Sequence, residues 1–185
     1  MHREIEVKFL EIDKEALKTT LRELGAIDAG EDLLDETIWY DKEMKWRDVE
    51  HKFVRMRVRK DSASLSFKKR HSHDIGGVEE IEFKTHDIEM ARLFLERLDL
   101  IPFRHQQKLR HTFSLDGVTV DIDTWPQIPT YVELEGESEE DLRSVAAKIG
   151  FSWSNARLES ARQIIEKVYG IKMGDMKHFT FSKME

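Results

Sequence analysis

Charged and apolar residues alternate with a period of two in several short segments of this chain. Residues 4–9, Glu-Ile-Glu-Val-Lys-Phe, show the pattern first, and it returns in segments 53–59, 65–68, 78–84, 108–113, 118–123 and 131–135. Successive side chains of a strand point to opposite faces, so each segment has one charged and one apolar face. The segments are predicted to form one antiparallel sheet whose apolar face, including Ile81 and Phe83, is covered by helices.

Four other stretches carry apolar residues at helical spacing. These helices are predicted to begin near residues 13, 87, 138 and 156, and Gly25, Gly150 and Gly170 end the first, third and fourth of them. Their apolar stripes, such as Met90, Phe94 and Leu98, are predicted to lie in the core. The chain is therefore expected to have an α+β fold in a single domain.

Turn signals join the strands. Asp116-Gly117 lies between two alternating segments, and this dipeptide is favoured in two-residue hairpins. Residues 71–77 are predicted to form a longer loop that ends in Gly76-Gly77. This glycine pair is not read as a phosphate-binding loop, because no helix start with Lys-Ser or Lys-Thr follows it.

Composition excludes several classes of protein. The chain has 185 residues, a formal net charge of -7 and no cysteine. A negative net charge argues against binding to duplex nucleic acid, which depends on an uncompensated basic surface. The sequence lacks a signal-peptide pattern after Met1 and any apolar run of the roughly 20 residues that cross a bilayer. We therefore expect a cytoplasmic protein that does not span or bind a membrane.

The charges of the alternating segments are sorted by strand. Solvated sheet faces usually mix polar residues loosely, and an open solvated face is one interpretation of these charges. About eight strands can instead close into a barrel, whose interior would then collect the charged side chains. The sorting favours this closed arrangement, with a lumen lined by the following groups: Glu4, Glu6 and Lys8; Arg55, Arg57 and Arg59; Lys68; Glu80, Glu82 and Lys84; Lys108 and Arg110; Asp121 and Asp123; Glu133 and Glu135.

Basic and acidic groups in one lumen suit a metal-phosphate ligand. Arginine binds phosphate oxygens through two parallel hydrogen bonds, and lysine binds them as a point charge. Carboxylates hold Mg²⁺ or Mn²⁺, which bridge to phosphate oxygens. The sequence therefore indicates phosphoryl chemistry assisted by a divalent metal.

The same residues carry a family resemblance. Glu4-x-Glu6-x-Lys8 is similar to the ExExK signature of the CYTH domain family, the triphosphate tunnel metalloenzymes, named for class IV adenylyl cyclase and thiamine triphosphatase. The later elements follow in the family's order: Arg55-x-Arg57, Lys68, Glu80-x-Glu82, Lys108-x-Arg110, Asp121-x-Asp123 and Glu133-x-Glu135. The resemblance extends to about Tyr169, so we expect a tunnel domain at residues 1–170 and a C-terminal extension at 171–185.

The resemblance implies an eight-stranded antiparallel barrel with helices outside it, and a role for each charged group. Glu4, Glu6 and Lys8 would be catalytic, and Glu4, Glu6, Glu133 and Glu135 would hold Mg²⁺ or Mn²⁺. Glu80, Glu82, Asp121 and Asp123 would be further acidic lining or would support the residues that bind the ligand directly. The triphosphate would be bound by Lys8, Arg55, Arg57, Lys68, Lys108 and Arg110, with help from Arg59 and Lys84.

Several functions remain open on the sequence. A metal-dependent phosphohydrolase acting on tripolyphosphate or an organic or nucleoside triphosphate is favoured. A class IV adenylyl cyclase is the alternative, although residues 125–129 and Ser160-Ala161 depart from features of cyclase-like relatives. Trp39, Trp46 and Trp125 are candidates for stacking an organic ring, and Trp39 beside Tyr40 equally suits strand packing. A noncatalytic polyphosphate- or nucleotide-binding module and a barrel stabilised only by ion pairs are further alternatives, and a homodimer is possible.

Overall fold

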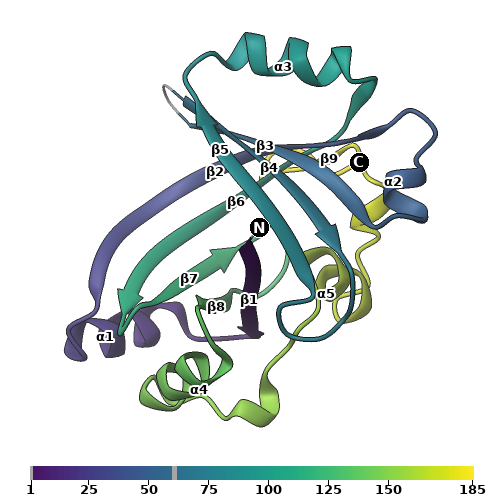
Figure 1. Cartoon of the computed structure of the whole chain (residues 1–185). Helices are drawn as coiled ribbons and strands as arrows, with labels where there is room; N and C mark the ends of the chain where they lie inside the picture. The colour runs from purple at the N-terminus through teal and green to yellow at the C-terminus, as the bar shows by residue number, and fades with distance from the viewer. Residues whose placement is uncertain (1, 60–61) are drawn as a thin grey trace.

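The computed structural model describes residues 2–59 and 62–185, with the side chains of residues 5–58 and 63–185. Within these residues one sheet contains β1 (His2–Phe9), β2 (Ile27–Asp41), β3 (Lys52–Arg59), β4 (Ser62–Arg70), β5 (Val78–Thr85), β6 (Leu100–Leu115), β7 (Val118–Thr124), β8 (Tyr131–Gly136) and β9 (His178–Phe179). The strand order is β2-β3-β4-β5-β1-β8-β7-β6-β9, and β2 also pairs with β6. Strands β1 to β8 therefore close into a ring of antiparallel neighbours, which confirms the predicted barrel (Figure 1).

Helices flank this barrel, which confirms the α+β class. They are α1 (Lys14–Glu23), α2 (Lys45–Asp48), α3 (Ile88–Arg97), α4 (Glu139–Lys148) and α5 (Ala161–Lys167), with short 3-10 turns η1 (Trp153–Asn155) and η2 (Met173–Asp175). Figure 1 shows α1 and α4 at one end of the molecule and α3 at the other. None of these helices is long and apolar enough to cross a lipid bilayer.

The apolar outer face of the barrel packs in two main clusters. The larger one joins β1, β6, β7 and β8 to α1 and α4, with Leu21 and Leu142 fully buried against the sheet. In the second cluster, Ala91 and Leu95 of α3 pack with buried residues of the other half, among them Trp39. Trp39 is 1% exposed, so of its two predicted roles the structure supports strand packing.

The outward stripe of α3 contradicts a prediction. Met90, Phe94 and Leu98 are 58%, 55% and 55% exposed, because α3 lies on the barrel through Ala91 and Leu95 instead. Ile81 and Phe83 on the outer face of β5 are likewise 52% and 54% exposed and are not covered by a helix. The helical and strand periods were predicted correctly, but the burial of these five side chains was wrong.

Local signals account for several element ends. Asp13 accepts hydrogen bonds from the backbone N–H groups of Glu15 and Ala16 and so caps α1. Asp116 and Gly117 both have positive φ, +51° and +80°, as a type I′ hairpin turn requires, and they join β6 to β7 as predicted. The last helix, in contrast, begins at Ala161, five residues later than predicted, because Ser160 and Gln163 form a capping box there.

Strand β2 has no counterpart among the predicted alternating segments. It pairs with β6 from Ile27 to Asp41 and with β3 from Asp35 to Trp39, and it closes the barrel. A register shift between Ile38 and Trp39 breaks the alternation, and three successive side chains, Ile38, Trp39 and Tyr40, are buried. A strand with such an irregularity loses the period-two signal that identifies the others.

The segment after residue 170 lies against the barrel. Strand β9 pairs in parallel with β6, His178 opposite His105 and Phe179 opposite Gln106. Met173 and Phe179 are buried in a cluster that also contains Trp125 and Tyr131. This segment and α5 therefore stand beside the β7–β8 connection, next to one side of the barrel (Figure 1).

Candidate active site

Strand register brings the charged groups of neighbouring strands onto one face. Glu6 of β1 is directly opposite Glu135 of β8, and Lys8 is opposite Glu133. Across the barrel, Arg57 of β3 is opposite Glu36 of β2. Directly opposed residues of antiparallel strands share a face, and here the other face is the apolar one packed on the helices. The charged face is thus the interior of the barrel.

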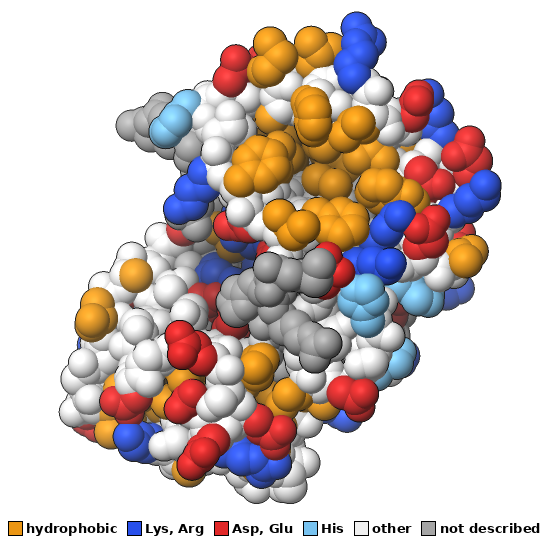
Figure 2. All heavy atoms as spheres, in the orientation of Figure 1, with side chains coloured by type: hydrophobic (Ala, Val, Ile, Leu, Met, Phe, Trp, Pro, Cys, Tyr) orange, Lys and Arg blue, Asp and Glu red, His pale blue; other side chains and the backbone are white. Residues whose placement is uncertain are grey.

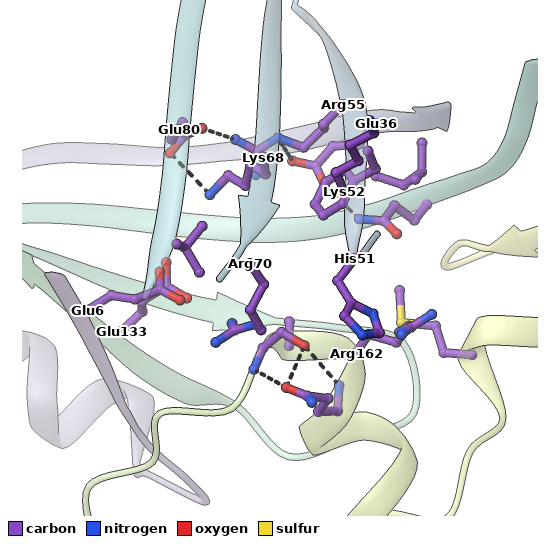
Figure 3. A pocket seen from close by; sticks show the side chains of 18 of the residues that line it. Glu6, Glu36, His51, Lys52, Arg55, Lys68, Arg70, Glu80, Glu133 and Arg162 are labelled. Carbon is purple, nitrogen blue, oxygen red and sulfur yellow. Dashed lines mark hydrogen bonds and ion pairs between the residues drawn. The ribbon is translucent and has the colours of Figure 1, made fainter. Parts of the chain in front are cut away.

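The interior holds a cavity of about 780 Å³, a volume typical of small-molecule sites. Figure 3 shows acidic and basic side chains from several strands converging on it. Its lining contains eleven of the charged residues that were predicted to line the lumen: Glu6, Lys8, Arg55, Arg57, Lys68, Glu80, Glu82, Lys108, Arg110, Glu133 and Glu135.

On the wall formed by β2 to β5, the cations are held by carboxylates. Arg57 donates from Nε to Oε1 of Glu36 at 2.8 Å. Glu80 accepts on both oxygens, with Nη2 of Arg55 at 3.4 Å and Nζ of Lys68 at 3.1 Å (Figure 3). These bonds set the two guanidinium groups and the ammonium group side by side at the cavity surface.

Lys8 connects two carboxylates on the opposite wall. Its ammonium group is 2.6 Å from Oε1 of Glu6 and 3.3 Å from Oε2 of Glu133, and the side chain is only 1% exposed. Figure 3 shows the side chains of Glu6 and Glu133 next to each other. A buried lysine between two carboxylates compensates charges that would otherwise repel.

Lys108 and Arg110 of β6 complete this wall. Asp123, which is fully buried, accepts from Nζ of Lys108 at 2.6 Å and from Nε of Arg110 at 2.7 Å. Arg110 also donates to Glu133 at 3.1 Å. Asp121 and Asp123 are buried and are not part of the cavity lining. They act from behind the cavity wall as ion-pair partners of the cations of β6.

Burial and neighbouring charges shift the pKa values of the buried carboxyl groups in opposite directions. Burial alone would raise the pKa of Glu36, but Arg55 and Arg57 lower it well below its usual value. Burial would likewise raise the pKa of Glu133, which Lys8 and Arg110 hold far below the ordinary range. Burial, followed by Arg110, lowers the pKa of Lys108. Glu36 and Glu133 are therefore ionised at neutral pH.

The donor set fits a hard divalent cation in part. Glu6, Glu133 and Glu135 supply oxygen ligands of the kind that Mg²⁺ and Mn²⁺ prefer. Within the described side chains, no group of three His, Asp or Glu residues lies close enough together to hold a metal ion alone. Mg²⁺ is commonly held by one or two carboxylates together with substrate phosphates and waters, and this set suits that mode.

Besides Asp121 and Asp123, which were expected in the lining and lie behind it, three further expected residues lie elsewhere or outside the described side chains. Lys84 is exposed and is not part of the cavity lining. The side chains of Glu4 and Arg59 are outside the described part of the chain, although the backbone of Glu4 pairs with Val78.

Other lining residues were not singled out from the sequence. Glu36 is 2% exposed and joins Arg57 to Gln106, whose Nε2 donates to it at 2.8 Å. His51 and Arg162 face another part of the cavity together with Arg70 (Figure 3). Arg162 comes from α5, far along the chain, so no local pattern places it there. Glu36 was not predicted because it lies in β2, whose irregular register removes the period-two signal.

The comparisons with known proteins agree with this architecture. The model of the CYTH domain matches residues 2–166, so the chain belongs to the CYTH family. A comparison with curated proteins gave no match.

Solved structures show the same fold. A Pyrococcus horikoshii protein, PH1012, has 20% identity and a TM-score of 0.69, covering 85% of this chain and 96% of its own. A putative adenylate cyclase from Vibrio parahaemolyticus has 13% identity and a TM-score of 0.74, covering 89% and 98%. A putative adenylyl cyclase from Hippeastrum, described as having a dominant triphosphatase activity, has 14% identity and a TM-score of 0.62, covering 90% and 96%.

Proposed function

We propose that this protein is a divalent-metal-dependent triphosphatase that binds tripolyphosphate, or an organic or nucleoside triphosphate, inside its barrel. The observation that supports it most directly is the placement of six sequence-predicted cationic side chains around one cavity that also contains acidic groups. The cations come from both walls: Lys8, Arg55, Arg57, Lys68, Lys108 and Arg110.

Binding would exchange ion-pair partners. Glu80 bonds to Arg55 and Lys68, and Glu133 bonds to Lys8 and Arg110. A triphosphate carries more negative charge than the carboxylates, and one arginine can hydrogen-bond to two of its oxygens at once. The substrate would thus replace carboxylates as the partner of the cations, and the released carboxylates become available to other ligands.

Such an exchange also explains why the interior tolerates so many charges. A buried ion pair is weak evidence for stability, because desolvation offsets much of the attraction. A barrel stabilised only by these pairs would gain little over an apolar interior. A noncatalytic module that holds anions would need the cations, but it would not need Glu6, Glu133 and Glu135 in the same cavity.

Hydrolysis forms a bond from water to the terminal phosphorus and breaks the bond to the bridging oxygen, which releases orthophosphate and a diphosphate. The lysines and arginines would stabilise the charge on the transferring group and on the leaving oxygen. Glu6, on the wall beside Lys8, would orient the water and accept its proton. A bound metal would neutralise phosphate charge and favour ionisation of the water.

Cyclisation of ATP is the second candidate. Tyr40, Phe53 and Trp125 line the cavity beside the charged groups and give a nucleoside an apolar surface. In that reaction the ribose 3′-hydroxyl would give up its proton to a carboxylate and bond to the α-phosphorus, and the bond from this phosphorus to the bridging oxygen would break and release pyrophosphate. We favour hydrolysis because residues 125–129 and Ser160-Ala161 depart from features of cyclase-like relatives.

A variant of Glu6 tests the proposal. Glu6→Gln keeps the size of the side chain, and Lys8 retains Glu133 as a partner, so the fold should persist. We expect kcat for phosphate release from tripolyphosphate with Mg²⁺ or Mn²⁺ to fall by at least about 100-fold. Glu139→Gln is the control, because Glu139 lies on α4 and pairs only with exposed Arg143 in the described structure. Equal turnover by wild type and Glu6→Gln would remove Glu6 from the mechanism.

A further inference from the structure

Helix α3 carries apolar side chains on two sides, although one side meets the barrel. Ala91 and Leu95 are 7% and 3% exposed and pack in the core. Met90, Phe94 and Leu98 lie on the other side and are each more than half exposed. An amphipathic helix normally buries its apolar stripe, so the exposed part of the stripe on α3 has the character of a surface that is covered in the working protein.

The exposed surface extends beyond the helix. Ile81 and Phe83 on the outer face of β5 are 52% and 54% exposed, and Leu93 is 40% exposed. Figure 2 shows apolar side chains gathered over α3 and the strands beside it. We name this surface the α3 patch and define it by six residues: Ile81, Phe83, Met90, Leu93, Phe94 and Leu98.

The size of the patch matches that of a small dimer interface. A large apolar side chain can bury roughly 150–200 Å², so six that are about half exposed present on the order of 450–600 Å². Two copies of the patch would bury roughly 900–1,200 Å², at the lower limit of specific interfaces. Contiguous patches of this size on a monomer commonly mark interaction sites.

The order of residues along α3 suits a second copy of the same helix. Met90 and Leu98 lie four residues before and four residues after Phe94. A twofold axis near Phe94 would therefore bring Phe94 against its counterpart and Met90 against Leu98 of the other copy. Rows spaced by four residues are the ridges that interlock in the commonest class of helix packing.

The apolar row of α3 meets the symmetry requirement of a closed dimer. Met90, Phe94 and Leu98 are evenly spaced about Phe94, so the row presents the same sequence of apolar side chains to an antiparallel copy of itself. A self-complementary surface of this kind is the requirement for a closed twofold dimer.

We propose that the α3 patch is a homodimer interface in which α3 packs antiparallel against α3 of a second copy of this chain. The patch uses the outer face of β5, whereas Glu80 and Glu82 on its inner face line the cavity. Two complete barrels would therefore stand back to back, with their cavities separate. The proposal does not depend on the reaction that the cavity catalyses.

The test is the molar mass in solution, measured by sedimentation velocity and light scattering from about 1 µM to about 100 µM. Wild type should have twice the mass of one chain at the upper concentrations. Phe94→Glu should raise the dimer dissociation constant at least about 30-fold, because two copies of the residue are lost at the centre of the interface. Phe181→Glu is the matched control, since Phe181 is 47% exposed and belongs to the C-terminal segment.

A pair of opposite charges placed across the interface tests the antiparallel arrangement. Met90→Lys and Leu98→Glu should each weaken the dimer at least about tenfold, and the double variant should recover much of the affinity, because position 90 of one copy would then face the opposite charge at position 98 of the other. A wild-type chain that is monomeric throughout the concentration range would overturn the proposal. Binding of such a monomer to phosphatidylserine vesicles would assign the patch to a lipid surface instead. A dimer that Phe94→Glu leaves unchanged would place the interface elsewhere.

Discussion

Replacing Glu36 by glutamine should separate the electrostatic from the packing role of the barrel interior. Glu36 is 2% exposed and lies 2.8 Å from Nε of Arg57 and 3.8 Å from Nε of Arg55. Glutamine keeps the volume and one hydrogen-bonding oxygen but removes the charge. Two adjacent guanidinium groups, which stay protonated at any working pH, would then lose their shared buried counter-ion.

The expected loss of stability follows from the distances. A pair at 2.8 Å is worth about 6 kcal/mol at an effective dielectric constant of about 20, before desolvation is subtracted. Breaking a buried pair typically costs about 3–5 kcal/mol. We expect Glu36→Gln to lower the free energy of unfolding by about 3 kcal/mol, since glutamine retains part of the hydrogen bonding. For a chain of 185 residues this corresponds to roughly 6–12 °C in Tm.

Chemical unfolding and thermal melting, each with and without tripolyphosphate, measure this effect. The ligand should recover more of the Tm in Glu36→Gln than in wild type, because phosphate oxygens supply the missing negative charge to Arg55 and Arg57. Glu31→Gln on the same strand is the control: Glu31 pairs with Lys14 at the surface, and exposed pairs are worth at most about 1 kcal/mol. If the stability of Glu36→Gln equals that of wild type, Glu36 does not compensate the two arginines.

Two further changes bear on the fold and on the charges of the site. Gly77→Ala should destabilise the β4–β5 loop by about 1–3 kcal/mol in urea unfolding, because a Cβ there would lie 2.6 Å from the backbone oxygen of Ser72; an unchanged midpoint would show that the loop adjusts freely. Acid should destabilise the protein as well. The cations hold the pKa values of Glu36 and Glu133 below their ordinary 4.5, so their contribution is complete above the unfolded value and is lost as pH falls through the folded values. The free energy of unfolding should fall below about pH 4.5, and Glu36→Gln should flatten that fall; the same slope in both proteins would contradict the lowered pKa of Glu36.

The barrel could be predicted from the sequence because most strands alternate strictly. Glu6 and Lys8, or Arg55 and Arg57, each lie two residues apart, and this spacing places them on the inner face whatever the details of packing. Strand β2 was missed because both of its faces are buried near Trp39 and its register shifts there. Because β2 was not predicted, Glu36 was not predicted either, and the three-dimensional structure was needed to identify it as the counter-ion of Arg57.

The helices show a second limit of sequence reasoning. The spacing of Met90, Phe94 and Leu98 correctly indicated a helix, but α3 has a second apolar side at Ala91 and Leu95. Periodicity identifies apolar sides and cannot decide which one meets the barrel. Likewise, Arg162 and His51 reach the cavity through the tertiary arrangement of α5 and the segment before β3, and no spacing in the chain connects them.

The products formed from triphosphates test the central proposal most directly. Purified protein would be incubated with Mg²⁺ or Mn²⁺ and, separately, tripolyphosphate, ATP or thiamine triphosphate, and the products would be resolved by anion-exchange chromatography. We expect orthophosphate and the matching diphosphate from at least one substrate, only when the metal is present. Cyclic AMP with pyrophosphate would assign the cavity to cyclisation, and no turnover of any substrate with either metal would contradict the proposed enzyme.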